Sequence, residues 1–584
     1  MIDSHPPRPR LTLNVGITGH RANVLPAGVI DPLSACLDTV LARLRDAVEN
    51  LHRSDRSLFS KETPVWRLHT PLATGADQLA AESAHRLGYT VRALLPFPPS
   101  EYSNDFTGDE EHGEFARHLG AADEVFALPG ERTQENAAYV MVGKAVIAAA
   151  DILIAVWDGQ EGNGPGGTAH VVDLAIRGGV PVIHIEIDRD SMSLGEVRLL
   201  CGGDAVEPVC RSLADTRAFD ELVVDTLAPH TELERELIAG FYKERENLTN
   251  WRIEYPLLLA VLGIKRLPAY PWRQAPIKSE IEGAVDSHQL AYAWSNFLAI
   301  RHAQQFRSGH LTNYALSVLA VFIALSGYIV PNLKVYLVIA ELGVIALLFY
   351  NTWAGRKGDW HRRWLQYRHL AESLRPLVYL KRTGLAGPPF RTDVLPDPRH
   401  RRGNADWTRW YTSAIWREMP SPTGVMTQRR VADLISEIVE QQIVPQAAYH
   451  SVNARRMHEL DHRLQELGHV TMGSVIAAAL LYLVGYVVAP ALVKILSEPF
   501  VVFTAGLPTL GAALFGLRGH GEHLLAASRS ASMVEALNAN AERLRRASSL
   551  EFATLEMEST ASIMLADLNE WTVSYSERSL EIPG

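Results

Sequence analysis

The sequence predicts two structural parts: an α/β domain with a doubly wound parallel sheet, followed by an all-α region that crosses a membrane four times in two hairpins. Three observations predict this arrangement. Apolar strand-like runs alternate with helix-period segments across residues 10–190, which is typical of parallel α/β sheets. Turns that contain glycine follow several of those runs. Four dense apolar runs then occur in two pairs, each long enough to span the hydrocarbon core of a bilayer.

Length and composition indicate several domains in a reducing compartment. A chain of 584 residues exceeds what one hydrophobic core supports. The formal net charge of -10 gives no overall attraction to a polyanion, so nucleic acid is not an expected partner. Three cysteines without paired spacing are expected to be ordinary core residues. The first apolar run, residues 11–17, is too short for a signal sequence, so we expect the first domain to be cytoplasmic.

The first predicted strand, residues 11–17, leads into a turn with glycine and two basic residues. The segment reads LTLNVGITGHR. Such a turn lets backbone N–H groups approach a phosphate, and the helix that follows adds partial positive charge. A turn that serves packing alone is the alternative. The candidate ligand-binding residues are Gly16, Thr18, Gly19, His20 and Arg21.

A second unit of strand, turn and helix follows. Strand-like residues 65–69 precede ATGADQLAAESAHRLGY, in which apolar residues recur at helical spacing. The turn supplies four more candidate ligand-binding residues, Thr74, Gly75, Ala76 and Asp77.

The third unit reads ADILIAVWDGQEGNGPGGTAHVVDLAIRGGVPVIHIEID. It contains a buried strand at residues 152–157, a glycine-rich loop at 162–167, a helix from Thr168 and a strand at 180–187. Ligands of such sheets lie at the carboxyl ends of the strands, where we expect the three loops to converge. The candidate ligand-binding residues here are Asp158, Gly166, Gly167 and Thr168.

GITGHR, TGADQLAA and GPGGTAHVVDLA together resemble the SLOG superfamily over residues 10–190. That superfamily groups the LOG nucleotide-processing enzymes with DprA-like proteins and nucleotide-sensing modules. The resemblance implies a Rossmann-like fold and a nucleotide or nucleotide-derived second messenger as ligand. LOG phosphoribohydrolases have a PGGxGT loop followed by a glutamate. This chain lacks the glycine after Gly167, has Val171 in place of the glutamate, and has Asp173 out of register. We therefore expect binding and assign no catalytic residue.

Four apolar runs are predicted to cross the membrane. They cover residues 312–330, 335–353, 471–489 and 500–517. Each would span about 28 Å as a helix. The short turn at residues 331–334 predicts a first hairpin, and a loop at residues 490–499 with two prolines predicts a second. Pro508 is expected to kink the last helix.

Basic residues flank both predicted hairpins on one side. Because Lys and Arg near membrane ends stay on the cytoplasmic side, the first domain and the C-terminus are expected to be cytoplasmic. Trp353, Trp360 and Trp364 are expected to form an aromatic belt. The basic residues are Arg301, Arg307, Arg356, Lys357, Arg362, Arg363, Arg455, Arg456, Arg463, Arg518 and Arg529.

The membrane region contains an internal duplication. AESLR at residues 371–375 recurs as AERLR at residues 541–545, each time after a hairpin and before a tryptophan-bearing amphipathic stretch. Residues 291–420 and 445–580 resemble the SLATT family, two-helix membrane domains that accompany SLOG domains in bacterial conflict systems. The resemblance implies a homo-oligomeric, pore-forming effector of antiviral defence in the bacterial inner membrane. Residues 191–290 are expected to be a helical linker.

Glu341 is the only formally charged residue within the four predicted spans. A carboxylate in hydrocarbon is costly, so two explanations stay open. One is a glutamate that joins helices through Tyr314 or Asn351, and the other is a pore-facing carboxylate whose ring in an oligomer favours cations. The HGEH segment at residues 520–523 lacks zinc-protease spacing, so no metal site is expected.

Three functions are consistent with these features. The leading one is a membrane effector gated by a nucleotide. The alternative is a membrane-anchored nucleotide-processing enzyme, with Asp77 or Asp158 as general base or ribose ligand. A transporter is the least favoured, because four helices with one intramembrane acid leave little for a substrate path.

Overall fold

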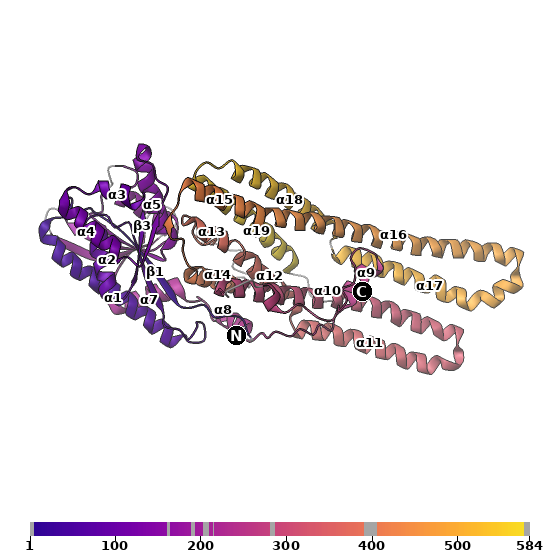
Figure 1. The fold of residues 1–584 in the computed structure, drawn as a ribbon. Coiled ribbons are helices and arrows are strands. Elements are labelled where there is room, and N and C mark those ends of the chain that lie inside the picture. The colour runs from indigo at the N-terminus through magenta and orange to yellow at the C-terminus, as the bar shows by residue number, and fades with distance from the viewer. Residues whose placement is uncertain are drawn as a thin grey trace.

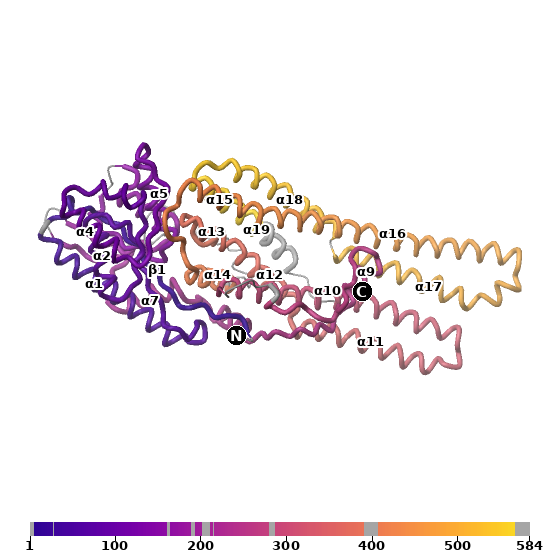
Figure 2. The backbone as a smooth tube through the Cα atoms, viewed as in Figure 1, coloured from indigo at the N-terminus to yellow at the C-terminus, as the bar shows by residue number. Residues whose placement is uncertain are grey.

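A computed structural model describes most of the chain. The described residues are 5–160, 164–188, 193–201, 209–213, 215–280, 286–390, 406–521 and 523–576. The sheet lies at one end of the molecule, the long apolar helices extend from the other end, and shorter helices lie between them (Figure 1). The same path is easily followed in the tube of Figure 2.

The N-terminal domain is built on a mixed nine-stranded sheet of order β8-β7-β6-β5-β1-β2-β3-β4-β9. Its strands are β1 (Thr12–Gly19), β2 (Val65–Thr70), β3 (Thr90–Leu95), β4 (Glu124–Ala127), β5 (Ile152–Trp157), β6 (Val182–Asp188), β7 (Ser193–Cys201), β8 (Val209–Ser212) and β9 (Gly424–Val425). The strands predicted at residues 11–17, 65–69, 152–157 and 180–187 are β1, β2, β5 and β6.

The prediction of a wholly parallel sheet is wrong at one edge. The pairs from β6 across to β9 are parallel, but β7 pairs antiparallel with β6 and β8 pairs antiparallel with β7. The reason is the connection after β6, which is too short to hold the crossover that a parallel pair requires.

Helices cover both faces of the sheet (Figure 1). They are α1 (Ile30–Ser54), α2 (Ala76–Arg86), α3 (Pro99–Tyr102), α4 (Gly108–Ala121), α5 (Glu135–Ala149), α6 (Thr168–Arg177) and α7 (Thr216–Leu227). Two glycines of β1 allow this close packing. A Cβ at Gly16 would lie 2.8 Å from Val146 of α5, and one at Gly19 would lie 2.5 Å from Ala76 of α2. Helices therefore pack tightly on opposite sides of the central strand.

The rest of the described chain is almost entirely helical. It contains α8 (Glu232–Tyr242), α9 (Glu254–Val261), α10 (Ser287–Ile329), α11 (Lys334–Lys357), α12 (Trp360–Leu374), α13 (Leu377–Thr383), α14 (Asp406–Glu418), α15 (Gln428–Ile438), α16 (Val444–Val488), α17 (Pro490–Gly521), α18 (His523–Arg545) and α19 (Leu550–Ser576). Four helical stretches among the described residues, containing α10, α11, α16 and α17, are long and apolar enough to cross a membrane. Many apolar side chains of these helices are exposed; Leu481, for example, has 73% of its surface accessible.

The order of elements explains the short repeat in the sequence. Helix α10 packs against α11 and α12, and α16 packs in the same way against α17 and α18. In AESLR, Ala371 and Leu374 are buried, and in AERLR the equivalent Ala541 and Leu544 are buried. The matching residues thus hold α12 and α18 against the long helices that precede them.

The predicted loop at residues 490–499 is wrong. Helix α16 ends at Val488 and α17 begins at Pro490, so only Ala489 separates them. Proline is tolerated in a first helical turn, where its missing N–H has no partner within the helix. Pro499 and Pro508 both lie inside α17.

The helical region is attached to the amino-terminal edge of the parallel strands. In α14, the Nε atom of Arg417 donates a hydrogen bond to Oδ1 of Asp151, which directly precedes β5, at 2.8 Å. The other oxygen of Asp151 accepts hydrogen bonds from the backbone and side chain of Asn14 at 3.0 Å. Strand β9, which follows α14, extends the sheet beside β4. The glycine-bearing turns lie at the opposite, carboxyl-terminal edge.

Candidate functional site

The turns after β1 and β2 contact each other through their backbones. The N–H of Ala22 donates to the carbonyl of Thr74 at 3.2 Å, and the N–H of Ala76 donates to the carbonyl of His20 at 3.2 Å. Gly75 lies between them with φ +94°, and a Cβ there would lie 2.6 Å from the backbone nitrogen of Ala22. Only glycine fits this position, because both the conformation and the close approach exclude a side chain.

The turns after β1 and β5 meet at His20 and Asp158. The Nε2 atom of His20 lies 3.3 Å from both the backbone nitrogen and the Oδ1 atom of Asp158. Strands β1 to β4 run in order to one side of β1, and the chain then crosses to β5 on the other side. The carboxyl end of such a crossover point is where open α/β sheets bind ligands. His20 and Asp158 lie at that point.

Asp77 is a buried carboxylate in the first turn of α2. It is only 5% exposed, and its Oδ2 accepts the N–H of Ala73 at 3.3 Å. Its Oδ1 is buried and has no hydrogen-bond partner among the described residues. Burial raises the pKa of Asp77 from 3.8 to about 7, against the opposing effects of the Ala73 N–H and the Arg21 charge. Asp77 is therefore poised to hold or release a proton near neutral pH.

Tyr139, in the second turn of α5, connects the first turn to the glycine-rich loop. The guanidinium of Arg21 lies 5.5 Å from the centre of its ring. On the other side, a Cβ at Gly166 would lie 3.0 Å from the Cβ of Tyr139. The Tyr139 hydroxyl donates to Asp105, which also accepts from Arg132. Arg21 and the glycine-rich loop are thus placed around one aromatic ring.

The described part of the glycine-rich loop, from Gly164 onward, leads into α6. Gly166 has φ +88°, and its N–H donates to Nδ1 of His170 at 3.0 Å. Gly167 is the N-cap of α6, whose first residue is Thr168, and no side chain of the described residues caps this end. The uncapped N–H groups at the start of α6 are available to an anion.

Two of the predicted residues do not lie where a ligand could touch them. Gly16 lies within β1 and is buried beneath Val146 of α5, so its role is packing. Ala76 is fully buried and fills the space beside Gly19. Thr18 is partly exposed within β1, one residue before the strand ends.

The two residues compared with the glutamate of LOG phosphoribohydrolases, Val171 and Asp173, have structural roles. Val171 is buried and packs against Gly143 of α5. Asp173 lies on the outside of α6 and pairs with Arg177 at 2.9 Å, with both side chains substantially exposed. Neither position brings a carboxylate to the glycine-rich loop.

No protein-family model, curated protein or solved structure matches this chain. The resemblances to the SLOG and SLATT families remain predictions from the sequence motifs.

Sequence reasoning missed Tyr139, Asp105 and Arg132. They follow no glycine motif, and they lie far along the chain from Arg21. Tyr139 stands on a helix whose apolar pattern indicates only burial. Their role becomes visible once α5 is placed beside β1.

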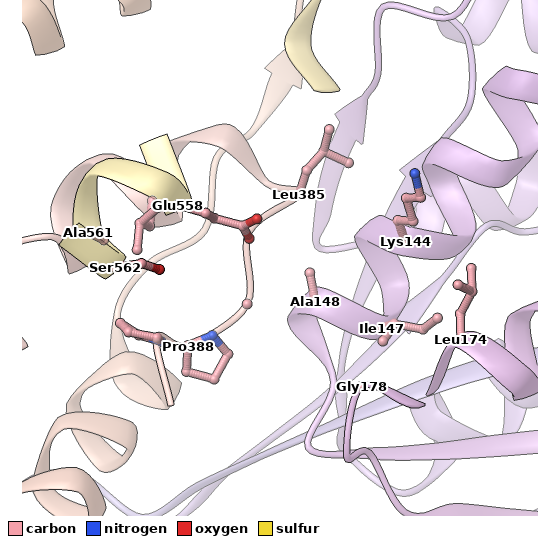
Figure 3. Close-up of a pocket in the computed structure, with 13 residues that line it drawn as sticks. Lys144, Ile147, Ala148, Leu174, Gly178, Leu385, Pro388, Glu558, Ala561 and Ser562 are labelled. Atoms are coloured by element: carbon pink, nitrogen blue, oxygen red, sulfur yellow. The ribbon is translucent and has the colours of Figure 1, made fainter. Parts of the chain in front are cut away.

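A cavity of about 340 Å³ lies between the α/β domain and the helical region, away from the glycine-bearing turns. Figure 3 shows Lys144, Ile147 and Ala148 of α5 on one side and Leu385, Pro388 and Glu558 on the other. Beside it, Lys144 forms an ion pair with Glu551 of α19 at 2.9 Å. Helix α5 therefore contacts the candidate site near its start and the C-terminal helix farther along.

Glu341 is half-buried on α11 and forms no hydrogen bond or ion pair among the described residues. Tyr314 and Asn351, the partners suggested for Glu341, form hydrogen bonds with other residues. The Tyr314 hydroxyl lies 2.8 Å from Nδ1 of His520, and the Asn351 amide donates to Asn313 and to the Gly309 carbonyl. Within the predicted HGEH segment, Glu522 lies outside the described residues.

The predicted aromatic belt is only partly exposed. Trp353 is 54% exposed, with Lys357 lying 4.7 Å from the centre of its ring. Trp364 is buried, because it packs against Phe306 of α10. Arg363 and Arg518, two of the flanking basic residues, form ion pairs within the protein, with Glu244 and Asp461 respectively.

Proposed function

We propose that this protein is a nucleotide-sensing membrane effector, in which a nucleotide or nucleotide-derived second messenger binds the α/β domain and the apolar helices open or disrupt a bilayer. The observation that carries the proposal is the arrangement along one sheet. Glycine-bearing turns occupy its carboxyl-terminal edge, and the helical region that contains the four apolar helices is fixed to its amino-terminal edge. In this proposal, the sheet joins the edge that binds the ligand to the region that lies in the membrane.

The chemistry of the carboxyl-terminal edge suits an anionic ligand. Arg21 is exposed and carries a permanent positive charge. The uncapped start of α6 adds backbone donors and the positive end of a helix dipole. His20 and Asp158 at the crossover point supply polar groups that can bind a ribose or a base.

We place the coupling between the two regions in α5. Tyr139 near its start would respond to a ligand that contacts Arg21 or the glycine-rich loop. Lys144 and Ile147 farther along contact α19 or line the cavity beside it. A ligand shifts the equilibrium only if its affinity differs between the two states, so the contacts of α5 must differ between closed and open forms.

In this proposal, the α10–α11 and α16–α17 pairs are membrane hairpins that enter from the cytoplasm of a bacterium and return to it. A homo-oligomer would form the pore. The exposed apolar surfaces of these helices face lipid or other subunits. Glu341 has no hydrogen-bond or ion-pair partner among the described residues, which favours its use between subunits or toward water.

Ion leakage from liposomes tests this function. The purified full chain is reconstituted, the liposomes are loaded with a self-quenching dye, and ATP, GTP, NAD or cyclic dinucleotides are added on the side of the α/β domain. The proposal expects dye release with at least one of them. No release with any of these compounds would count against it.

A membrane-anchored nucleotide-processing enzyme is the second candidate. It is favoured by one observation, the buried Asp77 with its raised pKa and its unpartnered Oδ1 atom, which has the properties of a general base. Steady nucleotide turnover by the full chain, abolished by Asp77→Ala, would support this candidate. Binding without turnover favours the effector.

A further inference from the structure

The segment of residues 250–273, here called the interfacial loop, is closed at its base. The N–H of Asn250 donates to the carbonyl of Trp272 at 2.7 Å, and the N–H of Gln274 donates to the carbonyl of Leu248 at 3.0 Å. The Gln274 side chain also donates to the carbonyl of Phe297 in α10 at 2.7 Å. The loop, which contains α9, is thus held at a fixed position on the long helices.

The interfacial loop contacts the first pair of apolar helices, α10 and α11, near the ends of their apolar runs that lie closer to the α/β domain. The N–H of Tyr255 donates to the Ser308 hydroxyl at 3.1 Å. Arg252 donates to the Thr312 hydroxyl at 3.3 Å and also to the Asn351 side chain. Thr312 is the first residue of one predicted span, and Asn351 lies near the end of the next.

The loop also contacts the second pair of apolar helices, α16 and α17, near the corresponding ends of their apolar runs. Leu259 and Leu262 form a buried cluster with Leu460 and Leu464 of α16, against which Leu514 of α17 packs. Arg463 donates to the carbonyl of Leu262. These positions precede the span at residues 471–489 or fall near the end of the span at 500–517. Helix α9 therefore lies between the two pairs, at the edge of the apolar zone nearest the α/β domain (Figure 1).

The interfacial loop exposes apolar and aromatic side chains to an unusual degree. Trp251 is 86% exposed and Val261 is 75% exposed. Such exposure is unfavourable in water, whereas tryptophan and tyrosine are enriched where a bilayer meets water. The other exposed members are Leu257, Leu267, Tyr270 and Trp272.

Apart from the ion pair between Arg252 and Glu254, the charged residues of the loop are basic. Lys265, Arg266 and Arg273 are exposed and form no ion pair among the described residues. No acidic residue occurs between Tyr255 and Gln274 to neutralise them. Basic residues next to an apolar zone are attracted to anionic phospholipid headgroups.

We propose that the interfacial loop lies in the headgroup layer on the side of the α/β domain and binds anionic phospholipid. This inference rests on the proposed membrane position of the apolar helices. The loop is continuous with their exposed apolar surface, it carries the aromatic residues that prefer the interface, and its charge complements anionic headgroups. It also joins the two pairs of helices, so lipid binding here fixes their relative position.

Depth measurement with a nitroxide label tests the placement. Val261→Cys is made in the full chain with Cys36, Cys201 and Cys210 replaced by serine, labelled, and reconstituted in phosphatidylcholine–phosphatidylglycerol vesicles. Leu481→Cys on α16 serves as the hydrocarbon control, and Leu233→Cys, an exposed leucine of α8, serves as the aqueous control. The label at 261 is expected at a depth between the two controls, judged by its relaxation by oxygen and by a water-soluble nickel complex.

The two controls distinguish an error in the position of the interfacial loop from an error in the position of the apolar helices. A label at 481 in hydrocarbon with a label at 261 as aqueous as that at 233 would overturn the interfacial loop alone. An aqueous label at 481 would overturn the membrane position of the helices as well.

The charge requirement has its own test. In the labelled chain, removing phosphatidylglycerol from the vesicles is expected to make the label at 261 shallower, because the basic side chains lose their anionic partners. The triple variant Lys265→Gln, Arg266→Gln, Arg273→Gln is expected to show the shallower depth in both lipids. A matched triple variant in the α/β domain, Lys61→Gln, Arg177→Gln, Arg217→Gln, should behave like the parent. A depth independent of lipid charge, or an equal effect of the matched variant, would overturn anionic lipid as the partner.

Discussion

Arg417 of α14 and Asp151 before β5 form an ion pair at 2.8 Å whose side chains are 14% and 5% exposed. Arg417 also donates to the carbonyl of Thr226, and its own carbonyl accepts from Arg67. The pair joins residues far apart in the sequence, one in each structural region. It fixes the helical region to the amino-terminal edge of the sheet.

Arg417→Ala is expected to destabilise the protein strongly. Removing one partner of a buried ion pair leaves a buried charge, which costs about 3–5 kcal/mol. The measurement is thermal unfolding of the full chain in detergent. Arg177→Ala, which removes an exposed pair, should cost less than about 1 kcal/mol. Equal losses of stability in the two variants would show that the ion pair between Arg417 and Asp151 does not stabilise the attachment of the two regions.

Asp77 is expected to make stability depend on pH. Its pKa is about 7 in the folded chain against 3.8 as the ordinary value, because of burial. The stability contributed by the protonated carboxyl is therefore complete below pH 3.8 and is lost as the pH rises to about 7. The Asp77→Asn side chain stays neutral, so the variant does not lose this stability. Its free energy of unfolding relative to that of the parent should therefore increase between pH 5 and pH 8, by an amount on the order of 1–3 kcal/mol.

Thermal unfolding at the two pH values measures this difference, with Asp173→Asn as the control for an exposed carboxylate. A constant difference between Asp77→Asn and the parent would mean that Asp77 is ionised throughout this range.

Gly167→Val is expected to weaken nucleotide binding without unfolding the domain. A Cβ at Gly167 meets only the carbonyl oxygen of Gly164, at 3.6 Å, an ordinary contact. The side chain would nevertheless stand where a phosphate approaches the start of α6. We expect at least tenfold weaker binding, about 1.4 kcal/mol, by calorimetric titration. Gly113→Val, in open space on α4, is the control, and unchanged affinity of the Gly167 variant would refute a phosphate site at this loop.

Lys334→Cys tests the predicted topology. Lys334 is exposed at the start of α11, and the ends of α10 and α11 that meet there point away from the sheet (Figure 1). It should therefore react with a membrane-impermeant maleimide in intact cells or spheroplasts. Leu233→Cys in α8 should react only after permeabilisation. The reverse pattern would place the α/β domain outside the cytoplasm.

Local patterns in the sequence predicted the four apolar helices and strands β1, β2, β5 and β6, but not the other five strands of the described sheet. Strand β5 was expected at residues 152–157 and occupies Ile152–Trp157, because a continuous apolar run between turns leaves little choice. The prolines at 490 and 499 predicted a loop, yet α17 begins at Pro490 and continues through Pro499. Pro490 is tolerated because it lies in the first turn of the helix, a position that the sequence alone does not reveal.

The candidate site was predictable only in part. Glycines such as Gly75 are recognisable because a turn needs them. Gly16 also belongs to the glycine motif, but β1 continues to Gly19, so Gly16 lies inside the strand and packs against α5. The sequence motif alone does not show where β1 ends. Tyr139 and the attachment through Arg417 arise from contacts between distant segments, which no local periodicity encodes.

Planar-bilayer recording of the purified full chain measures whether a nucleotide opens a conducting path through the membrane. Conductance is measured before and after ATP, GTP, NAD or cyclic dinucleotides are added to one side at a time, with Gly167→Val recorded in parallel. We expect conductance only when an active nucleotide is added on the side of the α/β domain, and we expect it to be reduced in the variant at the same nucleotide concentration. Conductance that is absent with every nucleotide, or equal with and without them, would contradict the proposed function.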